Sequence, residues 1–314
     1  MKRPLLVLVG PTAVGKTAVS VEVARRISAE IISGDSMQVY RGMDIGTAKI
    51  TPAEMGGVPH HLIDIKDPDE PFSVAEFQAR VDALIPEIIG RGHLPMLVGG
   101  TGLYIRSVLQ EYTFTEMEAD PELRQRLAAE EERHGRGYLH RRLAEVDPLS
   151  AKRLHPNDLR RIIRALEVYQ QTGLPISATQ TAGEAGPRYD DLFLGLSMER
   201  ELLYRRIDDR VDSMLAHGLE DEVRRLLARY RPDLPAMESI GYREMVWYLR
   251  GLTTRAEAVA LIKRNTRRFA KRQLTWFRKD HRIRWLDATQ TPTAALVEGI
   301  IRHVEGKWPE RLNK

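Results

Sequence analysis

The sequence predicts an α/β protein in which helices flank a parallel sheet and a mostly helical insertion interrupts the chain. Three observations carry this prediction. Short runs of branched apolar residues recur, and three of them end in glycine. Segments with helical periodicity separate these runs, as parallel strands require. A polar, helix-rich stretch then divides the chain into a core of residues 1–114 and 189–314 and an insertion of residues 115–188.

The individual elements follow from composition and spacing. Residues 5–9 are uniformly apolar, which indicates a strand buried on both faces. Val19, Val23 and Ile27 lie four residues apart and predict a helix over residues 17–28. We expect further strands over residues 30–33, 94–98, 192–196 and 283–286, and helices over residues 73–90 (with Ser73 as N-cap), 104–109 and most of the chain after residue 199.

The composition excludes several classes of protein. The chain contains no cysteine, which rules out disulfides, thiolate catalysis and cysteine-ligated zinc. Its 48 basic and 44 acidic side chains give a net charge of +4, which does not by itself identify a nucleic-acid partner. No apolar run approaches the ~18 residues of a membrane span. With no signal sequence recognised, we expect a cytoplasmic protein without a membrane partner.

The strongest single motif lies between the first strand and the first helix. It matches G-x-x-x-x-G-K-[ST] and consists of Gly10, Pro11, Thr12, Ala13, Val14, Gly15, Lys16 and Thr17. In such a loop the glycines let backbone N–H groups point at phosphate oxygens, the lysine adds positive charge, and the hydroxyl binds Mg²⁺. The motif therefore predicts a P-loop NTPase-like core that binds a diphosphate or triphosphate, with Thr17 as the metal ligand.

A carboxylate is expected at the same edge of the sheet. P-loop enzymes usually hold Mg²⁺ with an acidic residue at the end of a neighbouring strand, but the strand over residues 94–98 ends in Gly99. Asp35 follows the strand over residues 30–33 and is the acidic group at this edge. Its position fits three roles: a metal ligand, a general base toward an acceptor near the phosphates, or an Asx-turn residue.

The stretch from residue 263 to residue 284 is strongly basic. It holds ten lysines and arginines against one acidic residue, Asp280. Arg264, Arg268 and Arg272 recur every four residues and share one face of a predicted helix. Clustered positive charge of this kind is typical of a nucleic-acid-binding surface, so we expect this face to contact RNA. The interleaved aromatic residues are expected in the hydrophobic core: Phe269, Trp276 and Phe277.

A series of short motifs resembles the tRNA dimethylallyltransferase family, also called tRNA isopentenyltransferase. The motifs occur in order over nearly the whole chain, at residues 10–17, 33–40, 42–49, 59–62, 98–104, 155–158, 205–211, 240–244 and 271–276. Members of this family transfer a dimethylallyl group from its diphosphate to the exocyclic N6 amine of the adenine immediately 3′ of the anticodon in tRNA. Because the chain has no cysteine, it lacks the zinc finger of some eukaryotic relatives and resembles the bacterial type.

The resemblance implies roles for particular residues. The loop of residues 10–17 holds dimethylallyl diphosphate with Mg²⁺, and Arg210 adds a guanidinium to the diphosphate. Asp35 takes the proton from the adenine amine, and Thr101 hydrogen-bonds the same adenine. Contacts with the anticodon stem-loop of tRNA are expected from Asp35, Ser36, Met37, Gln38, Thr101, Arg160, Arg161, Arg164, Lys271 and Arg272. We expect a monomer.

Other functions remain open from the P-loop alone. A small-molecule kinase would use the same loop to bind ATP and would phosphorylate an acceptor. A non-catalytic RNA-binding module would use it as a nucleotide switch. The missing carboxylate after Val98 argues against both, and the series of motifs argues against them more strongly. His60 and His61 have no third ligand at useful spacing, so we expect a loop there rather than a metal site.

Overall fold

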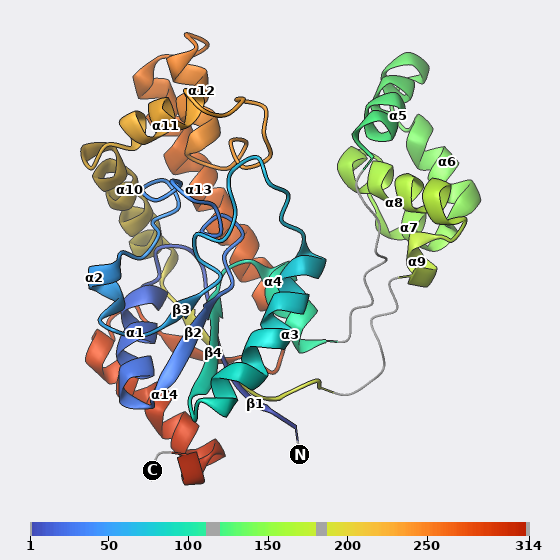
Figure 1. The fold of residues 1–314 in the computed structure, drawn as a ribbon. Helices are drawn as coiled ribbons and strands as arrows, with labels where there is room; N and C mark the ends of the chain where they lie inside the picture. The colour runs from blue at the N-terminus through green and yellow to red at the C-terminus, as the bar shows by residue number, and fades with distance from the viewer. Residues whose placement is uncertain (1, 111–119, 180–186, 312–314) are drawn as a thin grey trace. The chain divides into compact units, whose positions relative to one another are not determined.

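The computed structural model describes residues 2–110, 120–179 and 187–311. The chain splits into two compact units, Met1–Leu109 with Pro187–Lys314, and Gln110–Gly186 (Figure 1). The expected boundary between residues 114 and 115 falls outside the described residues. At the other boundary, the insertion is expected to include Arg188, but Arg188 belongs to the first unit, where its Nη2 donates to Asp82 Oδ2 at 2.7 Å.

A six-stranded parallel sheet forms the centre of the first unit. Its strand order is β3-β2-β4-β1-β5-β6. The strands are β1 Pro4–Val9, β2 Ala29–Ser33, β3 His60–His61, β4 Leu94–Gly99, β5 Asp190–Ser197 and β6 Arg284–Asp287. All the strands expected from the sequence are present. The expected loop at His60 and His61 is wrong, because these residues pair with Ile31 and Ile32 as a two-residue edge strand that is too short to show periodicity.

Helices follow the strands and cover both faces of the sheet. In the first unit they are α1 Lys16–Arg26, α2 Pro52–Met55, α3 Val74–Gly90, α4 Gly102–Leu109, α10 Arg200–Ala216, α11 Leu219–Leu227, α12 Tyr242–Leu249, α13 Arg255–Phe277 and α14 Thr293–Lys307, followed by a short 3₁₀ helix Pro309–Arg311. The predicted cap of α3 is confirmed, since the Ser73 hydroxyl accepts the backbone N–H of Glu76. Thr254 and Glu257 form a full capping box at the start of α13.

The two faces of β1 explain its uniform apolar sequence. Leu6 and Leu8 are fully buried in a cluster with residues of α1 and α14. Leu5 and Val7 are fully buried in a second cluster, with residues of α3 and α4 on the other face. Figure 1 shows these two helical layers on opposite sides of the sheet. The carboxyl ends of the strands are left free for the loops that carry polar residues.

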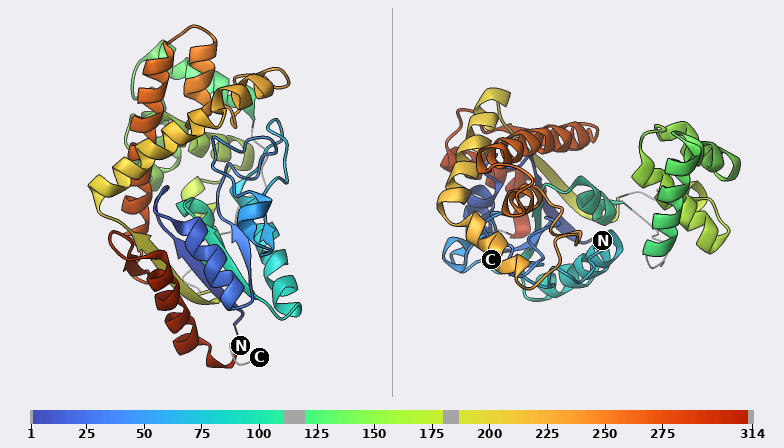
Figure 2. Two further views of the ribbon diagram at one scale, coloured as in Figure 1. Left: turned by 90° about the vertical axis from the view of Figure 1, so that its left-hand side faces the viewer. Right: turned by 90° about the horizontal axis from the view of Figure 1, so that it is seen from above.

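Helices α10 to α13 form a layer that extends beyond the carboxyl ends of the strands (Figure 2, left). This layer is continuous with the core of the sheet, because Ile207 of α10 and Ala270 of α13 pack in the cluster with α1 and α14. The loop after β2 packs into this layer. Val39 and Met43 from the loop are fully buried in a cluster with Val223 of α11 and Met245 of α12. The loop that follows Asp35 is therefore part of the hydrophobic core.

The second unit is helical throughout its described part. It contains α5 Pro121–His134, α6 Tyr138–Val146, α7 Pro148–Arg153, α8 Leu159–Thr172 and α9 Ile176–Thr179. Leu127, Leu139, Leu143 and Ile162 are buried in a core of its own. Across residues 2–110, 120–179 and 187–311, no helix combines the length and the apolar character that a membrane crossing requires.

Candidate active site

The loop between β1 and α1 curls around the ammonium group of Lys16. Its Nζ donates to the backbone carbonyl oxygens of Gly10 at 2.9 Å and Pro11 at 2.8 Å. Gly15 has a φ of 103°, a left-handed conformation that favours glycine, at the point where the loop enters the helix. Thr17 lies in the first turn of α1 and is exposed. The loop therefore has the shape and the charge of a phosphate-binding loop.

Two cations meet at this loop, and within the described ranges neither forms an ion pair with a carboxylate. Burial, together with the positive charge of Arg210, lowers the pKa of Lys16 to about 7, against the opposing effect of Asp35. Burial also lowers the pKa of Arg210, while Asp35 and Glu54 act in the opposite direction. Arg210 Nη1 lies 3.5 Å from the hydroxyl of Thr12 in the loop. Cations that are destabilised in this way indicate a site that binds an anion.

A second arginine of α10 approaches the same loop. Arg206 lies one helical turn before Arg210, and a Cβ atom built on Gly15 would lie 4.0 Å from its Nη1. Arg206 is not among the site residues predicted above. Its four-residue spacing from Arg210 is the signal that would have indicated a shared helix face.

Asp35 forms an Asx turn. Its Oδ1 accepts the backbone N–H groups of Met37 at 2.8 Å and Gln38 at 3.3 Å. Within the part of the chain that the structure describes, Oδ2 has no hydrogen-bond partner. The turn therefore fixes the side chain through one oxygen and leaves the other able to accept a proton. The turn and the general base are thus compatible roles for this residue.

Hydrogen bonds between the ends of β2 and β4 place Thr101 beside Asp35. The backbone N–H of Gly34 donates to Val98 O at 2.7 Å, and that of Thr101 donates to Gly34 O at 3.3 Å. Thr101 in turn accepts the N–H groups of Tyr104 and Ile105 at the start of α4. Two of the three predicted catalytic residues therefore lie on loops that are joined directly through the backbone.

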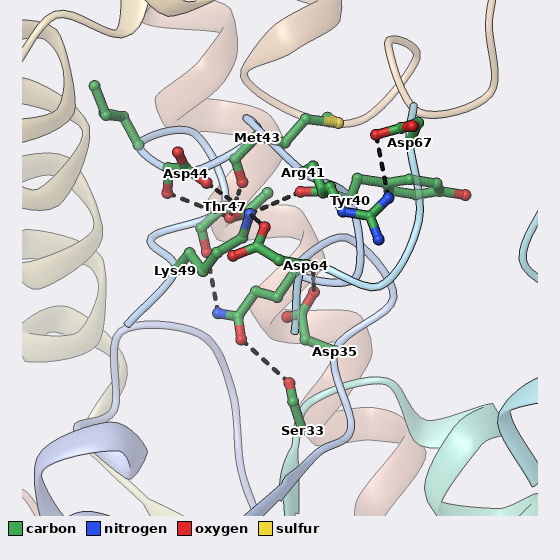
Figure 3. Close-up of polar contacts among 12 residues, drawn as sticks. Ser33, Asp35, Tyr40, Arg41, Met43, Asp44, Thr47, Lys49, Asp64 and Asp67 are labelled. Atoms are coloured by element: carbon green, nitrogen blue, oxygen red, sulfur yellow. Dashed lines mark hydrogen bonds and ion pairs between the residues drawn. The ribbon is translucent and has the colours of Figure 1, made fainter. Parts of the chain in front are cut away.

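The loop after Asp35 is held by internal polar contacts (Figure 3). The buried Lys49 donates to Asp44 Oδ1 at 2.6 Å, Asp64 Oδ1 at 2.5 Å and Tyr40 O at 2.7 Å. The side-chain amide of Gln38 accepts from the Ser33 hydroxyl at 3.2 Å and donates to backbone carbonyls of residues 47 and 48 at 3.4 Å. Gln38 thus supports the loop from within, and its contact with tRNA stays a prediction.

Glu222 of α11 anchors the same loop and was not found from the sequence. This carboxylate is 2% exposed. It accepts the consecutive backbone N–H groups of Asp44 at 3.1 Å, Ile45 at 2.8 Å and Gly46 at 3.1 Å, and the hydroxyl of Tyr242 at 2.6 Å. Glu222 and Asp44 lie 178 positions apart in the chain. No local pattern in the sequence signals this contact.

The basic face of α13 is partly used in ion pairs. Arg267 binds Asp208 at 2.6 Å, and Lys263 binds Asp212 at 2.7 Å. Arg255, at the start of the helix, lies 3.5 Å from Glu220. The other basic side chains of α13 are exposed: Arg264, Arg268, Lys271 and Arg272. Among the described residues these four form no ion pair, so they, and not the whole run, are the free cations of α13.

The aromatic residues of α13 differ in their burial. Phe277 is 2% exposed and lies in the core, as predicted. Trp276 is 37% exposed, so its predicted place in the core is wrong. The physical reason is its neighbour: a Cβ atom on Gly102 would lie 2.2 Å from Trp276 Cδ1, so the indole covers a glycine on the surface. Phe269 is half-buried, with the Arg272 guanidinium 5.8 Å from its ring centre.

The three predicted arginines of the second unit lie on α8 and are not equivalent. Arg164 pairs at 2.7 Å with the fully buried Glu167, which Arg124 also holds at 2.9 Å. Arg161 pairs with Asp158 at 3.0 Å, and Arg160 is exposed. Arg164 therefore neutralises a buried carboxylate, whereas Arg160 forms no ion pair with the residues that the structure describes.

A buried carboxylate near the start of β2 accounts for His61 without a metal. His61 Nε2 lies 2.7 Å from Glu30, and His93 Nδ1 lies at the same distance. The Arg91 guanidinium donates to both Glu30 oxygens, at 2.9 Å and 2.7 Å, and lowers the pKa of Glu30 to about 2. Among the residues that the structure describes, no group of three His, Cys, Asp or Glu side chains is arranged to hold a metal.

These features define a class of protein: a P-loop enzyme that binds a diphosphate or triphosphate. Its phosphate loop, buried cations and free carboxylate oxygen gather at the carboxyl edge of a parallel sheet. The family model described as IPP transferase matches residues 38–280, and the model described as isopentenyl transferase matches residues 4–69.

Sequence comparison with known proteins agrees with this class of enzyme and identifies the family. A tRNA dimethylallyltransferase of Symbiobacterium thermophilum is 72% identical over 100% of this chain and 99% of its own. The relative of that name in Desulforudis audaxviator is 57% identical over 91% of this chain and 93% of its own. The chain therefore belongs to the tRNA dimethylallyltransferase family, which are prenyltransferases, and the resemblance seen in its motifs is confirmed.

Solved structures give the same result for the fold. The full-length tRNA isopentenylpyrophosphate transferase of Bacillus halodurans has a TM-score of 0.74 at 49% identity, covering 99% of this chain and 98% of that one. A eukaryotic dimethylallyltransferase acting on tRNA has a TM-score of 0.77 at 30% identity, covering 98% of this chain and 77% of that one. The predicted P-loop-like α/β fold is confirmed, and a small-molecule kinase is not favoured.

Proposed function

We propose that this enzyme transfers a dimethylallyl group from dimethylallyl diphosphate to the N6 amine of the adenine immediately 3′ of the anticodon in tRNA, and releases diphosphate. The observation that carries the proposal is the pairing of two groups at one sheet edge. A loop with two cations destabilised by burial, Lys16 and Arg210, suits a diphosphate. The neighbouring Asp35 has one carboxylate oxygen without a hydrogen bond among the described residues, which suits proton removal from an acceptor.

The phosphate loop acts on the leaving group. When the allylic C–O bond breaks, negative charge develops on the diphosphate. The backbone N–H groups of residues 13–17, the Lys16 ammonium and the Arg210 guanidinium are placed to stabilise that charge as it forms. An anion in the loop also removes the electrostatic cost that lowers the pKa of both side chains in the free protein.

Asp35 and Thr101 act on the acceptor, the adenine of the tRNA. The adenine leaves the base stack so that its amine can reach the allylic carbon. The amine nitrogen forms its bond to this carbon while the C–O bond breaks, and Asp35 Oδ2 takes the proton that the amine loses. Thr101, which is joined to Gly34 through the backbone, holds the same adenine by a hydrogen bond. Atoms and charge balance, with diphosphate and N6-dimethylallyladenine as products.

The residues of the loop fit a bound Mg²⁺. The exposed hydroxyl of Thr17, in the first turn of α1, is a hard oxygen donor next to Lys16. Mg²⁺ commonly takes its remaining ligands from phosphate oxygens and water, so one protein ligand suffices. When bound, the ion supplies further positive charge to the diphosphate oxygens.

The tRNA contacts remain proposals for each residue predicted above. Lys271 and Arg272 support them best, because both are exposed and neither forms an ion pair with any residue of the described ranges. Ser36, Met37 and Gln38 follow Asp35 in the turn, and Arg160 is an exposed candidate on α8 that forms no ion pair with any described residue. We further propose a monomer that acts in the cytoplasm, where tRNA is found.

The experiment that tests the function compares Asp35→Asn with the wild-type enzyme. An asparagine oxygen still accepts the two N–H groups of the turn, but the side chain no longer takes a proton. Protein, Mg²⁺ and an anticodon stem-loop RNA are incubated with dimethylallyl diphosphate or with ATP, and mass spectrometry locates any added group. We expect one dimethylallyl group on the adenine, and a rate lower by roughly 10²-fold or more in the variant.

Two outcomes would contradict the proposal. An unchanged rate in Asp35→Asn would remove the general base. Phosphate transfer from ATP, with no gain from dimethylallyl diphosphate, would support the kinase instead.

A further inference from the structure

One buried side-chain amide joins the two loops of the site. Gln273 lies on α13 and is 7% exposed. Its Oε1 accepts the backbone N–H of Thr12, in the phosphate loop, at 2.9 Å. Its Nε2 donates to the backbone carbonyl of Gly100, which directly precedes Thr101, at 2.9 Å. A single side chain therefore bridges the loop that binds the diphosphate and the loop that is proposed to bind the adenine.

Close packing accompanies these hydrogen bonds. A Cβ atom on Gly100 would lie 2.2 Å from Gln273 Nε2, and one on Gly102 would lie 2.2 Å from Trp276 Cδ1. Gln273 and Trp276 are three residues apart on α13 and so share a face of the helix. The two glycines flank Thr101 on either side. Helix α13 consequently fixes the backbone of Thr101 from both directions.

The chemistry of the bridge requires an amide. The Thr12 N–H needs an acceptor, and the Gly100 carbonyl needs a donor, within one side chain. Glutamine supplies both, ionised glutamate supplies only acceptors, and aliphatic side chains supply neither. The sequence distance of 261 residues between Gln273 and Thr12 shows that the bridge is a property of the fold, not of a local turn.

We propose that Gln273 is a positioning residue that sets the distance between the bound diphosphate and the adenine. This inference rests on the proposed function. Without the bridge, each loop keeps its own ligand-binding groups, but the two loops are free to shift relative to each other. A displacement of ~1 Å from a near-attack geometry lowers a rate by on the order of 10²-fold. The effect belongs to the transfer step and not to the binding of either substrate.

The first test uses Gln273→Leu with Gln78→Leu as a matched control. Gln78 on α3 is also a part-buried glutamine that donates to a backbone carbonyl, that of Ser107, at 2.7 Å, but no hydrogen bond within the described ranges joins it to either loop. For each variant, melting temperature, affinity for inorganic pyrophosphate, affinity for the stem-loop RNA and single-turnover transfer rate are measured. We expect Gln273→Leu to lose about 10²-fold in transfer rate at saturating substrates while both affinities stay within about threefold. The control is expected to keep its transfer rate.

The second test uses Gln273→Glu and a pH series. A protonated glutamate offers one donor and one acceptor, as glutamine does, whereas the ionised form faces the Gly100 carbonyl with a second acceptor. Burial favours the neutral carboxyl. We expect the ratio of the variant rate to the wild-type rate to rise as the pH falls from about 8 to about 6. A purely structural role would leave this ratio flat.

The outcomes separate this inference from the proposed function. If the wild-type enzyme transfers no dimethylallyl group, the proposed function fails. If it does, the inference is overturned by a normal rate in Gln273→Leu, by an equal loss in Gln78→Leu, or by a flat pH ratio in Gln273→Glu.

Discussion

Replacing Lys16 by methionine is expected to stabilise the free protein while it abolishes transfer. The ammonium group sits among backbone carbonyls in a part-buried loop, with Arg210 nearby. Its pKa falls from 10.5 to about 7, so the folded protein holds this proton far less tightly than the unfolded chain does. Methionine keeps a similar length and volume without a group that must lose its hydration.

The magnitude follows from this shift. A pKa that is lowered from 10.5 to about 7 corresponds to roughly 4 kcal/mol of lost stability at pH 7. Methionine also loses the two hydrogen bonds to Gly10 and Pro11, each worth roughly 1 kcal/mol. The net gain is therefore about 2 kcal/mol, which raises the melting temperature of a unit of this size by about 4–8 °C.

The pH dependence has a defined sign. Between pH 7 and 10.5 the unfolded chain binds more protons at Lys16 than the folded protein does, so the wild type gains stability as the pH rises through this window. Lys16→Met has no such group. Its advantage is therefore largest at about pH 7 and below, and shrinks toward about pH 10.

Scanning calorimetry of both proteins without diphosphate, at about pH 7 and pH 9, measures this difference. A variant that is less stable than the wild type at neutral pH would refute the reasoning. So would an advantage that grows with pH.

Three further predictions concern other parts of the first unit. Glu30→Ala removes the buried carboxylate from Arg91 and is expected to lower the free energy of unfolding in urea by about 3 kcal/mol. Because the pKa of Glu30 is lowered from 4.5 to about 2, this contribution is present above pH 4.5 and lost as the pH falls toward 2. A stability difference between the two proteins that does not change with acid pH would contradict this prediction. Gly46→Ala places a Cβ atom 2.5 Å from Tyr242 Cε2 and is expected to lower the free energy of unfolding by about 1–3 kcal/mol. An unchanged urea midpoint would show that the Tyr242 ring moves aside without a cost in stability. Lys271→Ala is expected to reduce the salt dependence of stem-loop RNA binding by about 0.7–0.9 in the log–log slope and to leave pyrophosphate affinity unchanged; an equal effect on both ligands would argue against an RNA contact.

The central strands and the phosphate loop were predictable because their signals are local. Leu5 to Val9 are apolar on both faces since both faces of β1 are covered, and the loop motif specifies its own backbone path. Asp35 could be placed at the sheet edge because it directly follows a strand. Its turn could be proposed, but only the structure shows that one oxygen makes the turn while the other has no hydrogen-bond partner among the described residues.

The rest of the site depends on contacts between distant segments. Glu222 and Gln273 bind backbone groups 178 and 261 residues away, and a buried polar residue on an amphipathic helix gives no hint of its partner. Trp276 shows a related limit. Helical periodicity assigns a side chain to a face, but it does not show that the facing residue is a glycine, against which the indole packs.

The anchoring of residues 44–46 on Glu222 has a consequence for the resting enzyme. Three consecutive backbone N–H groups converge on this carboxylate, which is the arrangement that a phosphate-binding loop offers to its ligand. The described residues thus form two anion-binding loops of similar design. Residues 44–46 permanently bind the carboxylate of Glu222, whereas the phosphate loop of residues 10–17 binds a ligand that is exchanged in each turnover. When the diphosphate departs, only the phosphate loop loses its anion. The loop segment of residues 44–46 keeps its conformation for the next turnover.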